Sequence, residues 1–294
     1  MATGRQVQRI LQAHRQREGA GFVVRRPFPA PGVEQLDPFL LLDEMGPTEY
    51  APGEAVGAPD HPHRGFETVT YFLEGESEHE DSAGHKGVLR AGDVQWMTAG
   101  RGVVHSEMPS RHIQREGGRM HGFQLWVNLP RRDKMMAPRY QEVPRERIPT
   151  ARSEDGRARV VVIAGEALGA RAIIDTRTPI LFHHWTIDPG GRVSVPVPAE
   201  FNVYAYAFAG RAHISDPPRE VRDGQLAILG PGDAVTLGAP ADAGEPAQLL
   251  LLGGEPLREP LARFGPFVMN TPEEIRQAIL DYQSGRMGEI DRRS

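Results

Sequence analysis

The sequence predicts an all-β protein made of two similar units and one helix near the C-terminus. The 294-residue chain contains 33 Gly and 26 Pro, which is typical of folds with many turns. Short β-rich runs separated by turn residues recur along the chain, and one pattern in the first half returns in the second. A segment close to the end carries the residue pattern of a helix start.

The first half of the chain has the pattern of short strands that end at glycines. We expect residues 21–24 to enter a first strand, and residues 67–73 form a β-rich run that Glu74-Gly75 ends. The polar stretch 76–87 is typical of a loop. Further strands are predicted over residues 93–97, 103–107 and 122–129.

An internal repeat supports two copies of one β-unit. The residues YFLEG at 71–75 are echoed by YAFAG at 206–210, an offset of 135, and AGD at 91–93 is echoed by PGD at 231–233, an offset of 140. Duplication is the simplest account of these echoes, and chance similarity is the alternative.

The segment between the two copies predicts a domain boundary. Residues 130–155 are rich in Pro and charge, which favours a linker or a strap over the surface. We therefore expect an N-terminal metal-binding barrel over residues 1–135, a linker over 136–155, and a metal-free barrel with the terminal helix over 156–294.

The predicted helix begins after Thr271, which has Pro at the next position and Glu274 three residues on. Its apolar residues are spaced for one face, and Ser284-Gly285 ends it. We expect this face to pack against a barrel, with partner binding as the alternative. The apolar residues are Ile275, Ala278, Ile279 and Tyr282.

Charge and composition exclude several classes of protein. A net charge of -5 gives no electrostatic footprint for direct nucleic-acid binding, and no apolar run is long enough to span a membrane. The absence of Cys excludes disulfides and is compatible with a cytoplasmic location, which we expect. The Arg-rich N-terminus has the composition of an organelle transit peptide, but Glu18 interrupts it and no apolar region follows.

Two pairs of candidate metal ligands stand out. His61 and His63 are spaced i, i+2, as are His105 and Glu107. In a strand this spacing points both side chains to one face, so two strands of one barrel could bring three imidazoles and one carboxylate together. Each histidine taken alone is equally well explained as a surface or core residue.

The donor types narrow the choice of metal. Imidazole suits Zn, Cu, Fe and Ni, the carboxylate adds a hard oxygen, and no thiolate is available. Four such ligands leave about two positions open on a six-coordinate metal, as in non-haem Fe(II) oxygen chemistry. The first offset carries His61 and His63 to Pro196 and Pro198, and the second carries His105 and Glu107 to Glu245 and Ala247. Since most of these positions lack a donor, we expect the second unit to hold no metal.

Four motifs resemble the pirin family of the cupin superfamily. They are HPHRGFETVTY at 61–71, GDVQWMTAGRG at 92–102, HSEMP at 105–109 and QLWVNLP at 124–130. The likeness extends to LDPF at 36–39 and GPFVMN at 265–270, so it covers nearly the whole chain. It implies two cupin (jelly-roll) β-barrels facing each other, with iron in the N-terminal barrel only.

The resemblance also implies roles for individual residues. The four metal ligands map onto His61, His63, His105 and Glu107, with one Fe(II) per chain and Mn, Ni, Cu or Zn as competitors. Glu107 is in addition the candidate general base. Glu67, at the usual cupin glutamate position, is expected to be structural or to lie next to the ligands. Further pocket candidates are Arg64, Phe66, Trp96, Phe123, Gln124 and Trp126, with barrel core as the alternative for the aromatic ones.

Some pirin-like proteins act as quercetin 2,3-dioxygenases, which open a flavonol ring with O2 and release CO. The resemblance therefore implies a small aromatic substrate such as a flavonol, together with O2. The alternatives are an iron-dependent regulatory protein with a protein partner, or an enzyme that acts on another small molecule. We expect a monomer, because two barrels in one chain imitate a cupin dimer.

Overall fold

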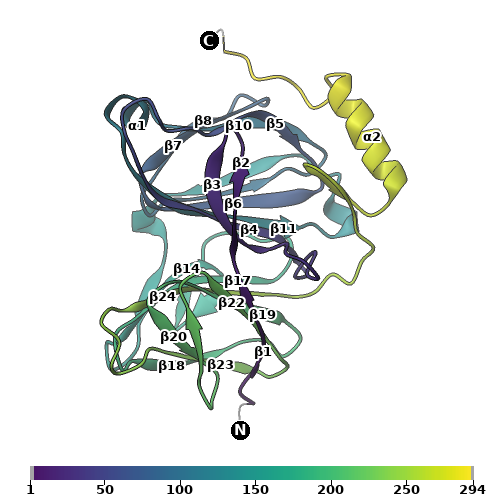
Figure 1. Ribbon diagram of the computed structural model, residues 1–294. Helices are drawn as coiled ribbons and strands as arrows, with labels where there is room; N and C mark the ends of the chain where they lie inside the picture. The colour runs from purple at the N-terminus through teal and green to yellow at the C-terminus, as the bar shows by residue number, and fades with distance from the viewer. Residues whose placement is uncertain (1–2, 293–294) are drawn as a thin grey trace. The chain divides into compact units, whose positions relative to one another are not determined.

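The computed structural model describes residues 3–292, and these form two compact units. The N-terminal barrel comprises Arg15–Pro29, Phe39–Arg145 and the segment that starts at Leu257. The C-terminal barrel comprises Ala30–Pro38, Glu146–Pro256 and the first strand, β1 (Val7–Gln12). Figure 1 shows strands as the main element of both units. No helix among residues 3–292 is long and apolar enough to cross a membrane.

The N-terminal barrel consists of two antiparallel sheets. The larger has the strand order β12-β9-β6-β11-β4-β3-β2, and the smaller has the order β5-β10-β7-β8. The strands of the larger sheet are β2 (His14–Glu18), β3 (Phe22–Phe28), β4 (Phe39–Tyr50), β6 (Phe66–Glu74), β9 (Val94–Thr98), β11 (Gly118–Asn128) and β12 (Arg139–Val143). Those of the smaller sheet are β5 (Ala58–His63), β7 (Glu76–Asp81), β8 (Lys86–Arg90) and β10 (Val103–Pro109). The short helix α1 (Arg111–Glu116) follows β10, and the 3-10 turn η1 (Arg131–Asp133) follows β11.

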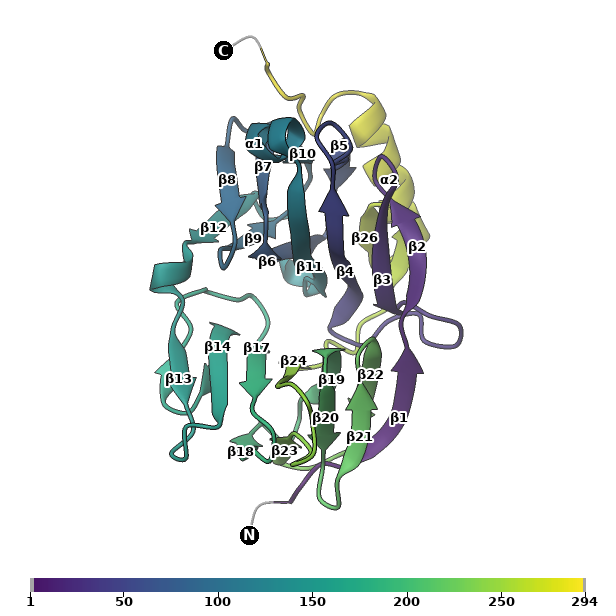
Figure 2. The same ribbon diagram turned by 60° about the vertical axis from the view of Figure 1, so that its left-hand side comes forward.

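The C-terminal barrel repeats this plan. Its larger sheet has the order β1-β22-β19-β24-β17-β14-β13, and its smaller sheet has the order β18-β23-β20-β21. Figure 2 shows the purple strand β1 beside the green strand β22, with which it pairs. The strands of the larger sheet after β1 are β13 (Thr150–Arg152), β14 (Ala158–Ala164), β17 (Ile180–Ile187), β19 (Asn202–Ala209), β22 (Gln225–Leu229) and β24 (Ala247–Gly254). The remaining elements are η2 (Arg145–Arg147), β15 (Glu166–Ala167), β16 (Ala170–Arg171), β18 (Arg192–Pro196), β20 (Arg211–Ile214), β21 (Arg219–Arg222) and β23 (Ala234–Gly238).

The strand orders confirm the duplication but correct one of the two sequence echoes. Residues 71–75 end β6 and residues 206–210 end β19, which occupy equivalent places in their sheets. Residues 91–93, in contrast, precede β9, whereas residues 231–233 precede β23, the equivalent of β10. The offset of 140 therefore joined two different turns that happen to share Gly-Asp.

Strand pairing and burial show what occupies the equivalent places in the C-terminal barrel. His61 pairs with His105 across β5 and β10, and Val195 pairs with Val235 across β18 and β23, which hold the same places in their sheet. The buried residues that these two strands add to the core are Val193, Val195, Val235 and Leu237, whereas Ser194 and Pro196 are exposed. None of these four positions in the C-terminal barrel carries an imidazole or a carboxylate.

The expected domain boundaries are wrong at both ends of the chain. Strand β1 belongs to the C-terminal barrel, and the last segment from Leu257 belongs to the N-terminal barrel. That segment contains β25 (Ala262–Phe264), β26 (Phe267–Met269) and helix α2 (Pro272–Gln283). The expected linker also contains β12, which pairs with β9. These exchanges depend on contacts between residues far apart in the sequence, which local patterns do not record.

The terminal helix has the predicted start, and its apolar face packs against the N-terminal barrel. Thr271 accepts a hydrogen bond from the Glu274 backbone N–H, and the Glu274 side chain accepts one from the Thr271 N–H, so the capping box is complete. Ile275 and Ala278 are buried in one apolar cluster with Val104 of β10. Helix packing thus reaches the strand that carries His105.

Two local predictions in the first half differ from the structure. Residues 76–87 are not a loop, since they contain β7 and the start of β8, which form a hairpin. Residues 21–24 enter β3 rather than the first strand, because β1 and β2 precede it. The Arg-rich N-terminal stretch therefore contains strands, and its charged side chains alternate with half-buried ones.

Candidate metal centre

Strands β5 and β10 bring three imidazoles together inside the N-terminal barrel. His61 and His63 share one face of β5, and His105 lies opposite His61 on β10. Their ligand atoms all lie within 4.8 Å of one another, and Nε2 of His61 is 3.1 Å from Nε2 of His63. The i, i+2 spacing in the sequence has therefore placed three possible donors around one point.

A glycine allows the chain to turn directly after the second histidine. Gly65 has φ +89°, and a Cβ on this residue would lie 1.9 Å from the Val268 carbonyl oxygen. Any other residue would push β26 away from the strand that carries His63, because a left-handed conformation and a close backbone contact coincide here.

The two inner imidazoles are neutral at ordinary pH. Burial is the largest cause that lowers the pKa of His63 well below its usual value, and His61 and His105 lower it further. Burial also lowers the pKa of His105 to about 4, against the opposing effect of Glu107. Neutral imidazole is the form that binds a metal.

His105 has buried ring nitrogens without a protein partner. Neither Nδ1 nor Nε2 of His105 finds a hydrogen-bond partner among residues 3–292. Since buried polar atoms are nearly always partnered, such a residue beside two other imidazoles fits a ligand of a metal ion.

Glu107 lies two residues beyond His105 and is held in place by neutral donors. Thr70 Oγ1 donates to Glu107 Oε1 at 3.0 Å, and Gln124 Nε2 donates to Oε2 at 2.8 Å. Burial raises the pKa of Glu107, but His105, His61 and these two hydrogen bonds lower it by more. The carboxylate is therefore ionised and oriented, although the group of mutually close ligand atoms consists of the three imidazoles alone.

Two of the three imidazoles border a cavity of about 600 Å³ in the N-terminal barrel. His61, His63 and Glu107 line it, so the candidate metal position is open to a small molecule. The apolar part of its lining includes Phe22, Leu41, Met45, Phe72, Met120 and Trp126. A cavity of this size with a few converging polar groups is typical of a ligand site.

Of the predicted pocket residues, Gln124 and Trp126 line the cavity. Trp126 donates from Nε1 to Gln124 Oε1 at 3.2 Å, and its ring lies 5.2 Å from that of His63. Phe66 is fully buried behind them, with its ring 4.3 Å from that of Trp126. Phe66 thus packs behind the wall of the cavity and does not line the cavity itself.

Trp96 and Phe123 are core residues rather than pocket residues. Both are fully buried and neither lines the cavity. Phe123 precedes Gln124 on β11, and successive side chains of a strand point to opposite faces of the sheet. When Gln124 faces the cavity, Phe123 must face away from it.

Arg64 and Glu67 are buried structural residues. Arg64 donates to the Arg101 carbonyl oxygen at 2.6 Å and pairs with Asp281 of α2 at 2.8 Å. Glu67 accepts a hydrogen bond from Thr98 Oγ1 at 2.6 Å. Arg64 directly follows His63, so its ion pair links the terminal helix to the end of β5. Neither Arg64 nor Glu67 lines the cavity.

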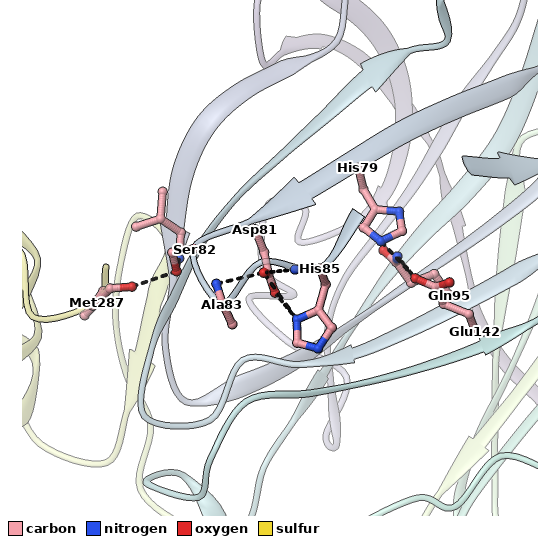
Figure 3. A network of polar contacts seen from close by, with 9 residues as sticks. His79, Asp81, Ser82, Ala83, His85, Gln95, Glu142 and Met287 are labelled. Atoms are coloured by element: carbon pink, nitrogen blue, oxygen red, sulfur yellow. Dashed lines mark hydrogen bonds and ion pairs between the residues drawn. The ribbon is translucent and has the colours of Figure 1, made fainter. Parts of the chain in front are cut away.

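A polar network on β7 supports β10, the strand that carries His105 and Glu107. His79 lies opposite Glu107, and Asp81 lies opposite His105. Figure 3 shows His79 directed toward Glu142, at 2.8 Å, and Asp81 accepting hydrogen bonds from the backbone of Ala83 and from His85. The buried Asp81 therefore fixes the end of the hairpin beside the imidazoles.

Sequence reasoning missed several residues that line the cavity. Thr70 supports Glu107, while Arg26, Asp43 and Arg263 place charge in the lining. Thr70 belongs to the HPHRGFETVTY motif itself and lies on the same face of β6 as the pocket candidate Phe66, so strand alternation could have found it. Arg263 comes from β25, about two hundred residues after His63, and no local pattern indicates its position.

Comparison with known proteins agrees with this architecture. The Pirin family model matches residues 21–127, and the model of the Pirin C-terminal cupin domain matches residues 182–288. Pirin of Mus musculus is 45% identical over 293 residues, covering 98% of this chain and 96% of the mouse protein. A Pirin-like protein of Solanum lycopersicum is 45% identical over 283 residues, covering 96% of this chain and 92% of the tomato protein.

Solved structures show the same fold. A crystal structure titled quercetin 2,3-dioxygenase from Acinetobacter baumannii has a TM-score of 0.91 at 36% identity, covering 98% of this chain and all of that one. Bacterial pirin YhhW from Escherichia coli, solved in complex with nickel(II), has a TM-score of 0.60 at 21% identity, covering 84% of this chain and 99% of that one, a likeness of fold alone. Both halves of the chain are cupin domains, and the protein belongs to the pirin family.

Proposed function

We propose that the protein is a mononuclear non-haem iron dioxygenase of the quercetin 2,3-dioxygenase type, with one Fe(II) in the N-terminal barrel. The observation that carries this proposal is the convergence of three imidazoles, two of them buried, beside a 600 Å³ cavity. The likeness to the A. baumannii protein titled quercetin 2,3-dioxygenase supports it. We propose His61, His63, His105 and Glu107 as the ligands.

The donor set suits iron without selecting it. Imidazole and carboxylate donors also bind Mn, Ni, Cu and Zn, and Cu and Ni exceed Fe(II) in intrinsic affinity. Two open coordination positions and the absence of thiolate fit the donor pattern of non-haem iron oxygenases. A bound Fe(II) would act as a Lewis acid and would supply the redox chemistry that dioxygen requires.

The residues of this chain would prepare a flavonol for that chemistry. Glu107 is ionised and can accept the proton of the flavonol hydroxyl, while Thr70 and Gln124 hold its oxygens toward the cavity. Trp126 and the other apolar residues would cover the flat rings and exclude water. Holding both reactants in one orientation supplies a large part of the catalysis.

Anaerobic reconstitution with Fe(II) tests the proposal. We expect one metal per chain, and on admission of air a stoichiometric loss of quercetin absorbance and oxygen with release of CO. Glu107→Gln keeps the side-chain shape but removes the charge, so it should abolish most of the turnover. One bound metal without loss of quercetin or oxygen would refute the flavonol assignment and favour the iron-dependent regulatory role.

The proposal also covers the oligomeric state of the protein and its location in the cell. We propose a monomer that works in the cytoplasm with a small aromatic substrate and O2, and without direct contact to nucleic acid, since the net charge is -5 and no Cys is present. Light scattering of the metal-loaded protein tests the assembly, because a mass near 32.4 kDa identifies the monomer.

A further inference from the structure

The cavity has a second polar region besides the imidazoles, and it carries charge. Glu18, Arg26, Asp43 and Arg263 all contribute to its lining. Arg26 is already neutralised, since its Nε donates to Asp43 Oδ1 at 2.6 Å and its Nη2 pairs with Glu18 at 2.8 Å. Of the two arginines in the lining, only Arg263 has no acidic partner among residues 3–292.

A row of polar side chains leads from Glu107 to this charged region. On the larger sheet Gln124 pairs with Thr70 on one side and with Asp43 on the other, and Arg26 follows on the next strand. Since directly paired residues face the same side of a sheet, this row crosses one wall of the cavity. Apolar residues flank the row, with Trp126 and Leu41 paired on one side of it and Gly122 and Met45 on the other.

Arg263 is placed to contact a ligand that occupies the cavity beside this row of polar side chains. Its guanidinium lies 5.0 Å from the centre of the Trp126 ring, and the Trp126 ring lies 5.2 Å from that of His63. Among residues 3–292 it donates one hydrogen bond, to the Leu40 carbonyl oxygen at 3.3 Å, and its side chain is exposed to solvent. Most of its five N–H donors can therefore bind a group one indole ring away from the imidazoles.

The guanidinium of Arg263 itself favours an anion as that group. Arg26 is neutralised by Asp43 and Glu18, which leaves Arg263 as the lining cation without an ion-pair partner among residues 3–292. A guanidinium over an aromatic face can bind a carboxylate through two parallel hydrogen bonds. The planar aromatic wall beside it suits a flat ring as the body of the ligand.

We propose that the substrate is a flat aromatic acid, with its metal-binding hydroxyl at the imidazoles and its carboxylate on Arg263. This inference rests on the proposed function, because it assumes that the metal end of the cavity holds the reacting end of the substrate. Arg263 is then a specificity-determining residue that separates aromatic acids from neutral flavonols of the same shape. Its location on β25 also gives the terminal segment a direct part in substrate choice.

Binding without oxygen tests the inference separately from turnover. The probes are 3-hydroxyflavone and its 3′- and 4′-carboxylate derivatives, which share the metal-binding oxygens and differ in the distal group. Titration calorimetry uses metal-loaded protein under anaerobic conditions. We expect at least one carboxylate to bind about tenfold or more tightly than 3-hydroxyflavone, as one charge-assisted contact predicts. In Arg263→Gln this preference should vanish while the affinity for 3-hydroxyflavone stays within about twofold.

Two further variants control for indirect effects. Arg263→Lys keeps the charge without the planar fork and should retain part of the preference. Arg115→Gln removes an arginine that is exposed on α1 and should leave the preference unchanged. Equal affinities for all probes in the unmodified protein, absence of binding, or a preference that survives in Arg263→Gln would each overturn the inference. If the protein preferred the carboxylate probes but turned over none of them in air, the inference about Arg263 would stand and the dioxygenase assignment would be refuted.

Discussion

The two barrels share one strand order and differ in the side chains that point inward. Where the N-terminal barrel has His61 and His105 paired across two strands, the C-terminal barrel has the buried pair Val195 and Val235. The backbone that brings three imidazoles together therefore exists twice, and only one copy carries the donors. This difference shows that the fold supplies positions, while a few side chains decide whether those positions hold a metal.

The interiors differ in the same way. The C-terminal barrel is filled by a cluster of aliphatic side chains around the fully buried Trp185. The N-terminal barrel holds the 600 Å³ cavity, and its fully buried Trp96 lies outside the lining. The burial of a single imidazole does not by itself indicate a metal site. His183 of the C-terminal barrel is as buried as His105, but among residues 3–292 it belongs to no group of three possible metal ligands.

The largest expected effect is a loss of stability in the core of one barrel or the other. Trp185→Ala and Trp96→Ala each remove a fully buried indole, and we expect each to lower the free energy of unfolding of its own barrel by about 3–5 kcal/mol. Metal that binds the native N-terminal barrel should offset part of the loss in Trp96→Ala and none in Trp185→Ala. Denaturant unfolding with and without metal measures this, and equal rescue of both variants would contradict the separation.

Metal affinity should depend on one barrel alone. His105→Ala removes one of the converging donors, and we expect it to weaken metal binding at least about 100-fold, more than the loss of an outer hydrogen-bond partner causes. His213→Ala removes a half-buried histidine of the C-terminal barrel and should leave one metal per chain. Metal analysis after dialysis decides the point, and unchanged stoichiometry in His105→Ala would mean that the site is misassigned.

The fully buried imidazole of His183 predicts an acid sensitivity of the C-terminal barrel. Burial lowers the pKa of His183 to about 4, only partly opposed by the Ala164 backbone. The unfolded chain then binds a proton that the folded chain does not, so stability is lost as pH falls from about 6.5 to about 4, by at most about 3 kcal/mol. His183→Leu should flatten this part of the profile relative to the unmodified protein. Parallel profiles of the two proteins between pH 7 and pH 4 would show that His183 titrates normally.

The cluster of three imidazoles and the terminal helix could be predicted from local spacing, and other features could not. The i, i+2 spacing of His61 and His63 and the start at Thr271 each depend on neighbours in the chain. The hairpin at residues 76–90 was missed because the inward positions of β7 carry His79 and Asp81 of a polar network instead of apolar residues. Arg263 could not be found, because its place beside Trp126 follows from a contact between residues far apart in the sequence.

The smallest expected effect tests which barrel the terminal helix stabilises. Thr271→Ala removes the side-chain half of the capping box, and we expect a loss of about 1 kcal/mol. Since α2 buries Ile275 and Ala278 with Val104 and pairs Asp281 with Arg64, the loss should appear in the unfolding transition that metal shifts, which belongs to the N-terminal barrel.

Arg276→Ala, which removes an exposed ion pair on the same helix, should change that transition by less than about 0.5 kcal/mol. If Thr271→Ala lowered the metal-independent transition instead, the helix would stabilise the C-terminal barrel, as its position in the sequence suggests. The structure argues for the opposite result, because Arg64 next to His63 is the residue that binds the helix. Helix stability and metal affinity should therefore change together, and we expect Thr271→Ala to bind the metal slightly more weakly than the unmodified protein.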